Sequence, residues 1–174
     1  MELPKRKSLR LQSYDYSQNG AYFITICTQN KKCILGDIGM DTGDIVGDGV
    51  LDIPFIMLSH YGKIVEQTIL DIAKTYDDVE IPKYIIMPNH IHMIVHIENK
   101  KNGLSRTPTP TRANARIPSM VSTLKRFSNK KCGESIWQRS YHEHVIRNQT
   151  SYEEIWQYID TNPIKWELDC YYTT

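Results

Sequence analysis

Apolar and polar residues alternate over residues 91–97, a pattern that predicts a β-strand with two different faces. One face carries four apolar residues, which are Ile91, Met93, Val95 and Ile97. The other face carries His92 and Ile94, together with His90 immediately before the run. Pro88-Asn89 is a turn signal, and the apolar run 84–87 in front of it predicts an antiparallel partner strand.

Two further strands are expected. Residues 21–28 are rich in β-branched and aromatic side chains and should form the first strand, and another is expected at about 141–147. The Gly- and Asp-rich stretch 36–52 does not match a calcium-binding EF-hand loop, so we expect turns or a small hairpin there.

Apolar residues spaced three and four apart predict two amphipathic helices, one over about 56–75 and one from Ile117 to a stop at Gly133. A third helix should begin near Ser151, where both Thr150 and Ser151 have a Glu three residues on, as a capping box requires. Pro163 should end this helix.

Together these elements predict an α+β fold. The first six follow the order βαββαβ, the ferredoxin-like arrangement: an antiparallel sheet with helices on one face, to which the C-terminal helix is added. The length of 174 residues fits a single domain over 1–174. Residues 99–116, rich in Pro, Thr and Arg, should be a mobile basic linker within it.

Composition indicates a soluble, cytoplasmic protein. Hydrophobic residues make up 40% and charged residues 24% of the chain, and no apolar run is long enough to span a membrane. The basic N-terminus has no apolar stretch behind it, so it does not resemble a secretory signal. The four cysteines lack metal-binding spacing and are expected to be free thiols.

Charge is distributed very unevenly, although the net charge is only +1. Residues 37–80 contain ten acidic and two basic residues, whereas residues 99–133 contain nine basic residues and no acidic one. Such a basic segment favours a polyanionic partner, although a solvated loop and helix face would have the same composition.

The histidine pair is the strongest candidate for chemistry. Two residues along a strand span roughly 6.6–6.8 Å, so the imidazoles of His90 and His92 can reach one metal ion from the same face. An isolated His-x-His is also found as half-exposed strand histidines without a ligand. His96 lies on the same face, about 13 Å further along, and is too distant to share a compact site.

Tyr158 and Asn162 lie four residues apart on the predicted third helix, so they share one helix face. A phenol can act as a nucleophile, and a carboxamide oxygen can bind a hard cation. Alternatively, Tyr158 could pack on the sheet and Asn162 could cap the helix before Pro163.

These motifs resemble the single-tyrosine HUH transposases, and most closely the branch of REP-associated tyrosine transposases. The resemblance extends from about residue 10 to residue 166 and rests on an ordered set of segments. These segments are Tyr14-Asp15-Tyr16, Tyr22-Phe23-Ile24-Thr25, Met87-Pro88-Asn89-His90-Ile91-His92, Trp137-Gln138-Arg139-Ser140-Tyr141, His144-Val145-Ile146-Arg147 and Tyr158-Ile159-x-x-Asn162-Pro163.

The resemblance implies metal-dependent nicking and strand transfer on single-stranded or hairpin DNA. Tyr158 would be the catalytic nucleophile, and His90, His92 and Asn162 would hold Mg²⁺ or Mn²⁺. A 5′-phosphotyrosine intermediate would remove the need for a nucleotide cofactor. A replication-initiator or relaxase-type nickase and a non-catalytic nucleic-acid-binding module are the alternatives, and the sequence leaves the oligomeric state open.

Basic and aromatic residues outside the motif are candidates for holding the DNA. These candidates are Arg116, Lys125, Arg126, Lys130, Lys131, Trp137 and Arg139. Trp137 could stack on an extruded base or could equally be a core residue. His142 and His144 share one strand face and could support the site or contact substrate, although a structural role is favoured over a catalytic one for each.

Overall fold

The computed structural model describes residues 19–41, 53–98 and 116–172. Its centre is a four-stranded antiparallel sheet in the order β4-β5-β1-β6. The strands are β1 (Gly20–Cys27), β4 (Val79–Met87), β5 (His90–Ile97) and β6 (His142–Ile146). With the helices between them they follow the expected βαββαβ order, and the α+β class is confirmed.

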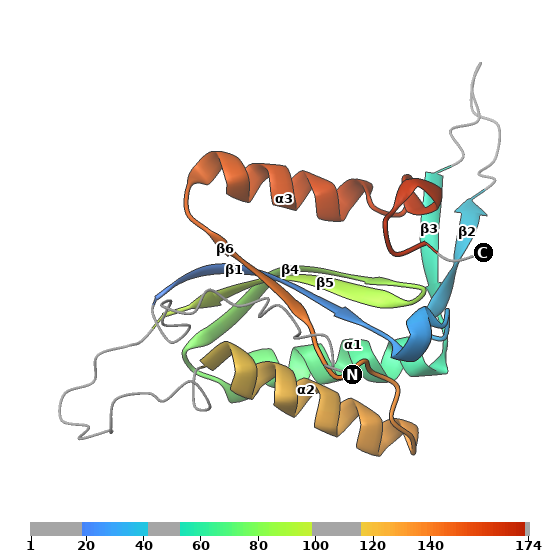
Figure 1. The fold of residues 1–174 in the computed structure, drawn as a ribbon, viewed down its shortest axis with the longest axis horizontal. Helices are drawn as coiled ribbons and strands as arrows, with labels where there is room; N and C mark the ends of the chain where they lie inside the picture. The colour runs from blue at the N-terminus through green and yellow to red at the C-terminus, as the bar shows by residue number, and fades with distance from the viewer. Residues whose placement is uncertain (1–18, 42–52, 99–115, 173–174) are drawn as a thin grey trace, which may run out of the picture.

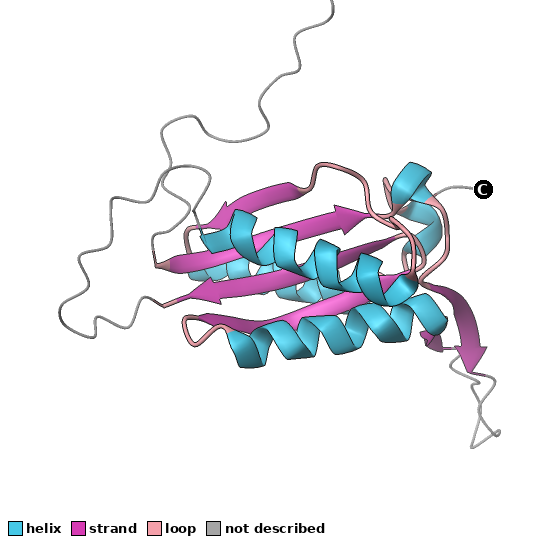
Figure 2. Cartoon of the chain, turned by 90° about the horizontal axis from the view of Figure 1, so that it is seen from below, coloured by secondary structure: helices cyan, strands magenta, loops and turns pink. Residues whose placement is uncertain are grey.

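Helices cover both faces of this sheet (Figures 1 and 2). α1 (His60–Thr75) and α2 (Arg116–Cys132) pack together on one face, and α3 (Gln149–Thr161) lies on the other. The larger apolar core forms under α1 and α2 and takes the four apolar residues of β5, which are Ile91, Met93, Val95 and Ile97. A smaller cluster joins Ile94, Ile146 and Ile159 under α3. The two faces predicted for β5 are therefore confirmed.

The turn between β4 and β5 fixes the position of the histidine pair. Met87 pairs with His90 across the two strands, so only Pro88 and Asn89 form the connection. β5 then pairs with β1, which places His92 opposite Thr25 and His90 opposite Cys27. Both histidines thus lie in the middle of the sheet, on the face that α3 covers.

The start of the first helix was predicted wrongly. Residues 53–58 form the strand β3 (Ile53–Leu58), which pairs with β2 (Gly36–Asp41) in a two-stranded ribbon beside the main sheet. α1 begins only at His60, where the Ser59 side chain accepts a hydrogen bond from the Gly62 backbone. Over so short a run the apolar residues of β3 fit both the helical and the strand periodicity. Pairing with β2 makes the segment a strand.

The cap of the third helix was also predicted wrongly. α3 begins at Gln149, and the side chain of Asn148, rather than Thr150 or Ser151, accepts a hydrogen bond from the Ser151 backbone at 2.8 Å. The predicted ends are confirmed: α3 stops at Thr161 before Pro163, and α2 stops before Gly133, whose φ of +77° suits glycine.

Two short 3₁₀ helices, η1 (Gln29–Lys31) and η3 (Trp166–Leu168), complete the described structure. Among the described residues no helix has the length and apolar character that crossing a membrane requires. The predicted linker 99–116 lies outside the described residues except for its last residue, Arg116, which begins α2.

Candidate active site

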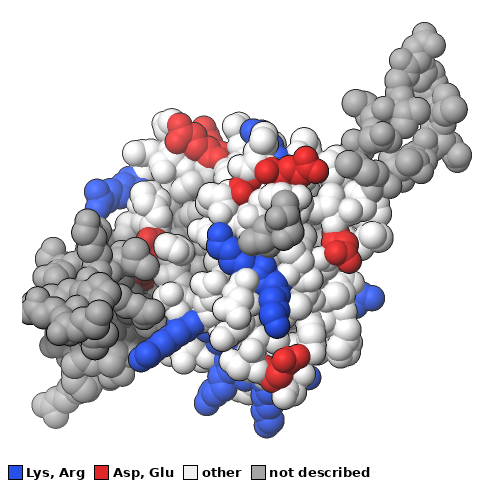
Figure 3. Space-filling view, turned by 45° about the vertical axis from the view of Figure 1, so that its right-hand side comes forward, with Lys and Arg blue, Asp and Glu red and all other residues white. Residues whose placement is uncertain are grey.

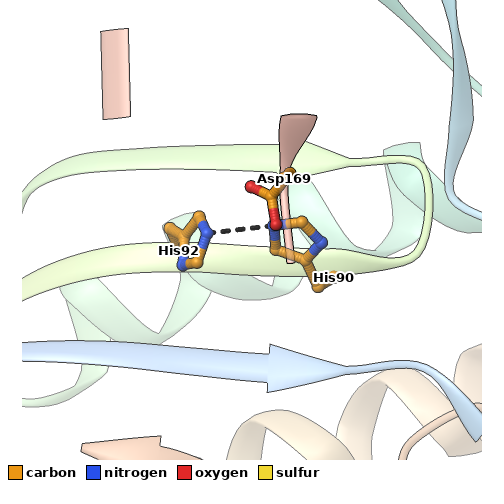
Figure 4. A group of neighbouring side chains, drawn as sticks. All are labelled: His90, His92 and Asp169. Carbon is orange, nitrogen blue, oxygen red and sulfur yellow. Dashed lines mark hydrogen bonds between the residues drawn. The ribbon is translucent and has the colours of Figure 1, made fainter. Parts of the chain in front are cut away.

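His90 and His92 converge on one point beneath α3. Their Nε2 atoms lie 3.0 Å apart, and both side chains are almost completely buried. Figure 4 shows the two imidazoles projecting from β5 on the same side, with the carboxylate of Asp169 beside them. The structure therefore brings the predicted pair together as a candidate metal centre.

The Nδ1 atom of each imidazole is held by an oxygen from a neighbouring residue. Nδ1 of His90 lies 2.8 Å from Oδ1 of Asn89, whose amide nitrogen donates to backbone carbonyls of Lys31 and Tyr171. Nδ1 of His92 lies 2.8 Å from the hydroxyl oxygen of Thr25. Because Oδ1 of Asn89 can only accept, His90 carries its proton on Nδ1 and presents the Nε2 lone pair to the site.

Burial keeps both histidines neutral. It is the main cause that lowers the pKa of His90 and of His92 below the usual value of about 6.5. Neutral imidazole is the form that binds metal ions. The two side chains are therefore in the protonation state that a metal ligand needs.

Asp169 is the third member of the cluster, and the sequence did not point to it. Its carboxylate follows η3, and the ligand atoms of His90, His92 and Asp169 all lie within 4.8 Å of one another. These three residues can hold a metal ion. The C-terminal segment has no strand or helix periodicity that would place Asp169 in the site, so it carried no usable signal.

Tyr158 reaches the same cluster from α3. Its hydroxyl oxygen lies 3.3 Å from Nε2 of His92 and donates a hydrogen bond of 3.1 Å to Oδ2 of Asp169. The side chain remains 37% exposed, which leaves one side of the phenol open to a substrate. Burial, and then the Asp169 carboxylate, raise the pKa of Tyr158 above its usual value of about 10.

Asn162 lies one turn after Tyr158 and is 2% exposed. Its amide nitrogen donates to Oδ2 of Asp169 at 2.8 Å, whereas its buried Oδ1 has no hydrogen-bond partner. A buried amide oxygen without a partner is costly unless something else binds it. The structure thus places the predicted Asn162 in the site with a vacant acceptor atom.

The residues around Asp169 cover the histidines with aromatic rings. The centroids of Tyr171 and Trp166 lie 4.6 and 5.9 Å from the His90 ring. On the other side Phe23 stacks on His92 at 5.1 Å and meets the edge of Tyr158 at 6.1 Å. This enclosure explains the low exposure of the two imidazoles.

A divalent cation fits this set of ligands. For ligand bonds of about 2.1 Å, two neighbouring positions on an octahedral ion are about 3.0 Å apart, which matches the Nε2–Nε2 distance. The carboxylate of Asp169 adds an oxygen donor, and Asn162, which binds that carboxylate, has a buried amide oxygen without a partner. Two imidazoles with oxygen ligands and no thiolate are compatible with Mn²⁺ or Mg²⁺.

Three of the predicted DNA-binding cations are already engaged within the protein. Arg116 forms an ion pair with Asp78, and Lys131 forms one with Asp71. The ammonium of Lys125 donates to the backbone carbonyls of Gln138 and Ser140. By contrast Arg126, Lys130 and Arg139 are exposed.

The basic helix lies on the opposite face of the sheet from the histidines (Figure 1). Its side chains therefore do not line the histidine–tyrosine site. Basic and acidic side chains are interspersed on the side that brings the β2–β3 ribbon and the C-terminus forward (Figure 3). The charge pattern of the sequence could not show on which face of the sheet the basic residues of α2 would lie.

Trp137 was a candidate for stacking on DNA, and the structure contradicts this role. The side chain is 3% exposed within the larger core, and its indole nitrogen donates to the hydroxyl of Ser128 at 2.7 Å. A base cannot reach the ring without unpacking the core. Trp137 is therefore a structural residue.

Comparisons with known proteins agree with this geometry. No protein-family model matches the chain. An uncharacterised protein of Haemophilus influenzae is 35% identical over 181 residues, covering 96% of this chain and 93% of the relative. A second protein of that organism, described as "Putative REP-associated tyrosine transposase", is 25% identical over 154 residues, covering 87% of this chain and 74% of its own length.

A solved structure of a REP-associated tyrosine transposase bound to a REP hairpin has the same fold. It superposes with a TM-score of 0.61 at 20% identity, covering 95% of this chain and 74% of that one. This shared fold brings a histidine pair, the Asp169 carboxylate and the Tyr158 hydroxyl together in one site. The chain is thus similar in sequence to an uncharacterised protein and, more distantly, to the protein described as "Putative REP-associated tyrosine transposase", and it shares the fold of a solved one.

Proposed function

We propose that this protein is a metal-dependent transposase that nicks single-stranded or hairpin DNA and transfers strands through a 5′-phosphotyrosine intermediate. The single observation that carries the proposal is the contact of 3.3 Å between the Tyr158 hydroxyl and Nε2 of His92. It joins an oxygen nucleophile to a pair of neutral imidazoles, and an accessible phenol beside a metal centre suits phosphoryl transfer.

Tyr158 attacks the scissile phosphorus. A new bond forms between the phenol oxygen and phosphorus, and the bond from phosphorus to the 3′ oxygen breaks, which leaves a 3′-hydroxyl on the released strand. Asp169 already accepts the hydrogen bond of the phenol, so its carboxylate is placed to take the proton. A free 3′-hydroxyl can reverse the step, because the phosphotyrosine retains the energy of the phosphodiester.

His90 and His92 would hold a Mg²⁺ or Mn²⁺ ion, with Asn162 and Asp169 as the oxygen donors. When bound, the ion supplies Lewis-acid polarisation of the phosphate. Thr25 and Asn89 keep the imidazole rings in orientation through the Nδ1 atoms. The ring of Phe23 packs against both His92 and Tyr158 and fixes their separation.

A DNA hairpin is the substrate class that the family suggests, because a related protein with this fold was solved bound to a REP hairpin. For this chain, Arg126, Lys130 and Arg139 remain the exposed cations of the predicted set. Arg126 and Lys130 lie on α2, on the opposite side of the sheet from Tyr158. They would contact the DNA only if it extends around the sheet to that side. Arg139 lies three residues before β6, a strand of that sheet, and is therefore a better candidate for contacting DNA at the Tyr158 face.

The test is covalent product formation. Wild-type protein is incubated with Mn²⁺ and a 3′-labelled pool of single-stranded hairpins with random flanks, and the products are separated under denaturing conditions. We expect a labelled protein band whose formation requires the metal ion and is lost in Tyr158→Phe. Binding without any covalent band would instead favour a non-catalytic nucleic-acid-binding module.

A further inference from the structure

β6 forms one edge of the main sheet, and two histidines project from it on the face that carries Tyr158. Among the described strands β6 pairs with β1 alone, which places His142 opposite Thr25 and His144 opposite Phe23. Side chains directly opposite each other on antiparallel strands lie on the same face. Thr25 and Phe23 both contact His92 there, so His142 and His144 lie on the face of the candidate active site.

The packing of β6 confirms this orientation independently. Ile146 lies two residues after His144, on the same face of the strand, and packs with Ile94 and Ile159 beneath α3. Val145 lies on the opposite face of the strand and packs against the core under α1 and α2. The two imidazoles therefore point away from that core.

This edge is the part of the face that α3 leaves open. α3 packs mainly on β4 and β5, and both His142 and His144 are exposed. Two rows cross the open surface, one from His142 through Thr25 to His92 and one from His144 to Phe23. His142 is two strand spacings, about 10 Å, from His92. Tyr158 adjoins this surface, because its ring contacts Phe23 in a T-shaped arrangement.

We propose that His142 and His144 are positioning residues that hold the DNA strand as it leaves the Tyr158 site. This proposal deepens the proposed function and rests on it. A single DNA strand would occupy this open surface, because the surface adjoins Tyr158 and presents hydrogen-bond donors instead of a large apolar area. An imidazole N–H donates to a phosphate oxygen whether the ring is neutral or charged, and the two rings, about 6.6–6.8 Å apart, can contact successive phosphates.

Charges at the ends of β6 fit the same occupant. Arg139 lies three residues before the strand and Arg147 directly follows it, and both are exposed. In chain order, the two imidazoles of β6 are thus flanked by one exposed cation before the strand and one after it. Phe23, which is half-buried in the row of His144, offers an aromatic ring to a base of the same DNA strand.

The experiment measures DNA binding separately from cleavage. Tyr158→Phe protein, which cannot form the covalent bond, is titrated with single-stranded hairpins with random flanks. The same titration is done with His142→Ala/His144→Ala added. We expect the Kd to rise about tenfold, as the loss of hydrogen bonds to charged phosphates predicts. The control is His60→Ala, an exposed histidine at the start of α1 on the far face, which should leave the Kd unchanged.

A second readout locates the strand directly. Photo-crosslinking with 5-bromouracil placed in the flanks should label peptides that contain residues 139–147. In the nicking assay, the double histidine variant should raise KM more than it lowers kcat and keep the wild-type affinity for Mn²⁺. An unchanged Kd with crosslinks confined to other peptides would overturn the proposal. Failure of the wild type to nick would refute the proposed function, yet the binding and crosslinking results would still decide the role of β6.

Discussion

The hydroxyl oxygen of Tyr158 lies 3.3 Å from Nε2 of His92, although 66 residues separate the two in the sequence. The contact joins α3 to the middle strand β5, and Phe23 of β1 packs against both rings. Three elements of the fold thus fix the position of one oxygen atom relative to the histidine pair. The predictions below test what this arrangement does.

Replacing either His90 or His92 by Ala should abolish nicking and reduce the affinity for Mn²⁺ by more than tenfold. Each imidazole would supply one of the two nitrogen ligands, so the remaining imidazole and the oxygen donors should bind the ion more weakly. Isothermal titration calorimetry measures the affinity, and circular dichroism checks the fold. The matched control is His96→Ala on the same strand, whose ring lies beside Tyr152 instead. Full nicking by either variant at limiting metal would remove the metal assignment.

Asn162 should act as a ligand in its own right and not only by holding Asp169. If so, Asn162→Ala lowers the affinity for Mn²⁺ about tenfold in the wild type and lowers it further in an Asp169→Ala background. The reason is that Oδ1 of Asn162 is buried without a partner, while its nitrogen alone binds Asp169. This double-mutant cycle separates the two roles. No additional loss in the Asp169→Ala background would show that Asn162 only positions the carboxylate.

Lys125 and Lys130 are on the same helix but should respond differently to substitution. Lys125→Met should lower the free energy of unfolding by about 1–3 kcal/mol, because two backbone carbonyls of the segment before β6 lose a charged donor. Lys130→Met should leave stability nearly unchanged. If Lys130 contacts a phosphate of a single strand, its loss reduces the slope of log Kd against log salt by about 0.7.

Chemical denaturation and fluorescence anisotropy at several salt concentrations measure the two effects. An unchanged salt slope in Lys130→Met and Arg126→Met would show that the outer face of α2 does not touch DNA. A changed slope in Lys125→Met, with no loss of stability, would mean that its ammonium is available to the substrate.

Trp137→Phe should destabilise the protein without changing its affinity for DNA. Phe retains most of the buried area but leaves the hydroxyl of Ser128 without the indole donor, a loss of about 1–2 kcal/mol. Thermal unfolding and anisotropy with the hairpin pool check this pair of outcomes. A weakened Kd at constant stability would restore Trp137 as a DNA contact.

The sequence predicted the histidine face of β5 because a strand has a period of two and each face packs against a different layer. The apolar face is covered by α1 and α2, so the histidines had to lie on the opposite face. The same reasoning places the basic α2 away from the histidines. Charge composition alone cannot do so, since it carries no information about which layer a helix joins.

Other parts of the site were not predictable from local pattern. Asp169 reaches the histidines only because the chain turns back after Pro163 and η3, and no periodic signal marks that path. The contact between Thr25 and His92 depends on the register of β1 with β5. Such contacts arise from tertiary packing, in which residues far apart in sequence meet.

The central claim is that Tyr158 becomes covalently joined to DNA, and mass spectrometry of the trapped peptide tests it most directly. Protein incubated with Mn²⁺ and single-stranded hairpin DNA is digested with nuclease and protease, and the nucleotide adduct is mapped. We predict an adduct on the peptide containing Tyr158, with a phosphate linked to the phenol oxygen, and none in Tyr158→Phe. An adduct on Tyr152 or Tyr141, or one that persists in Tyr158→Phe, would contradict the account.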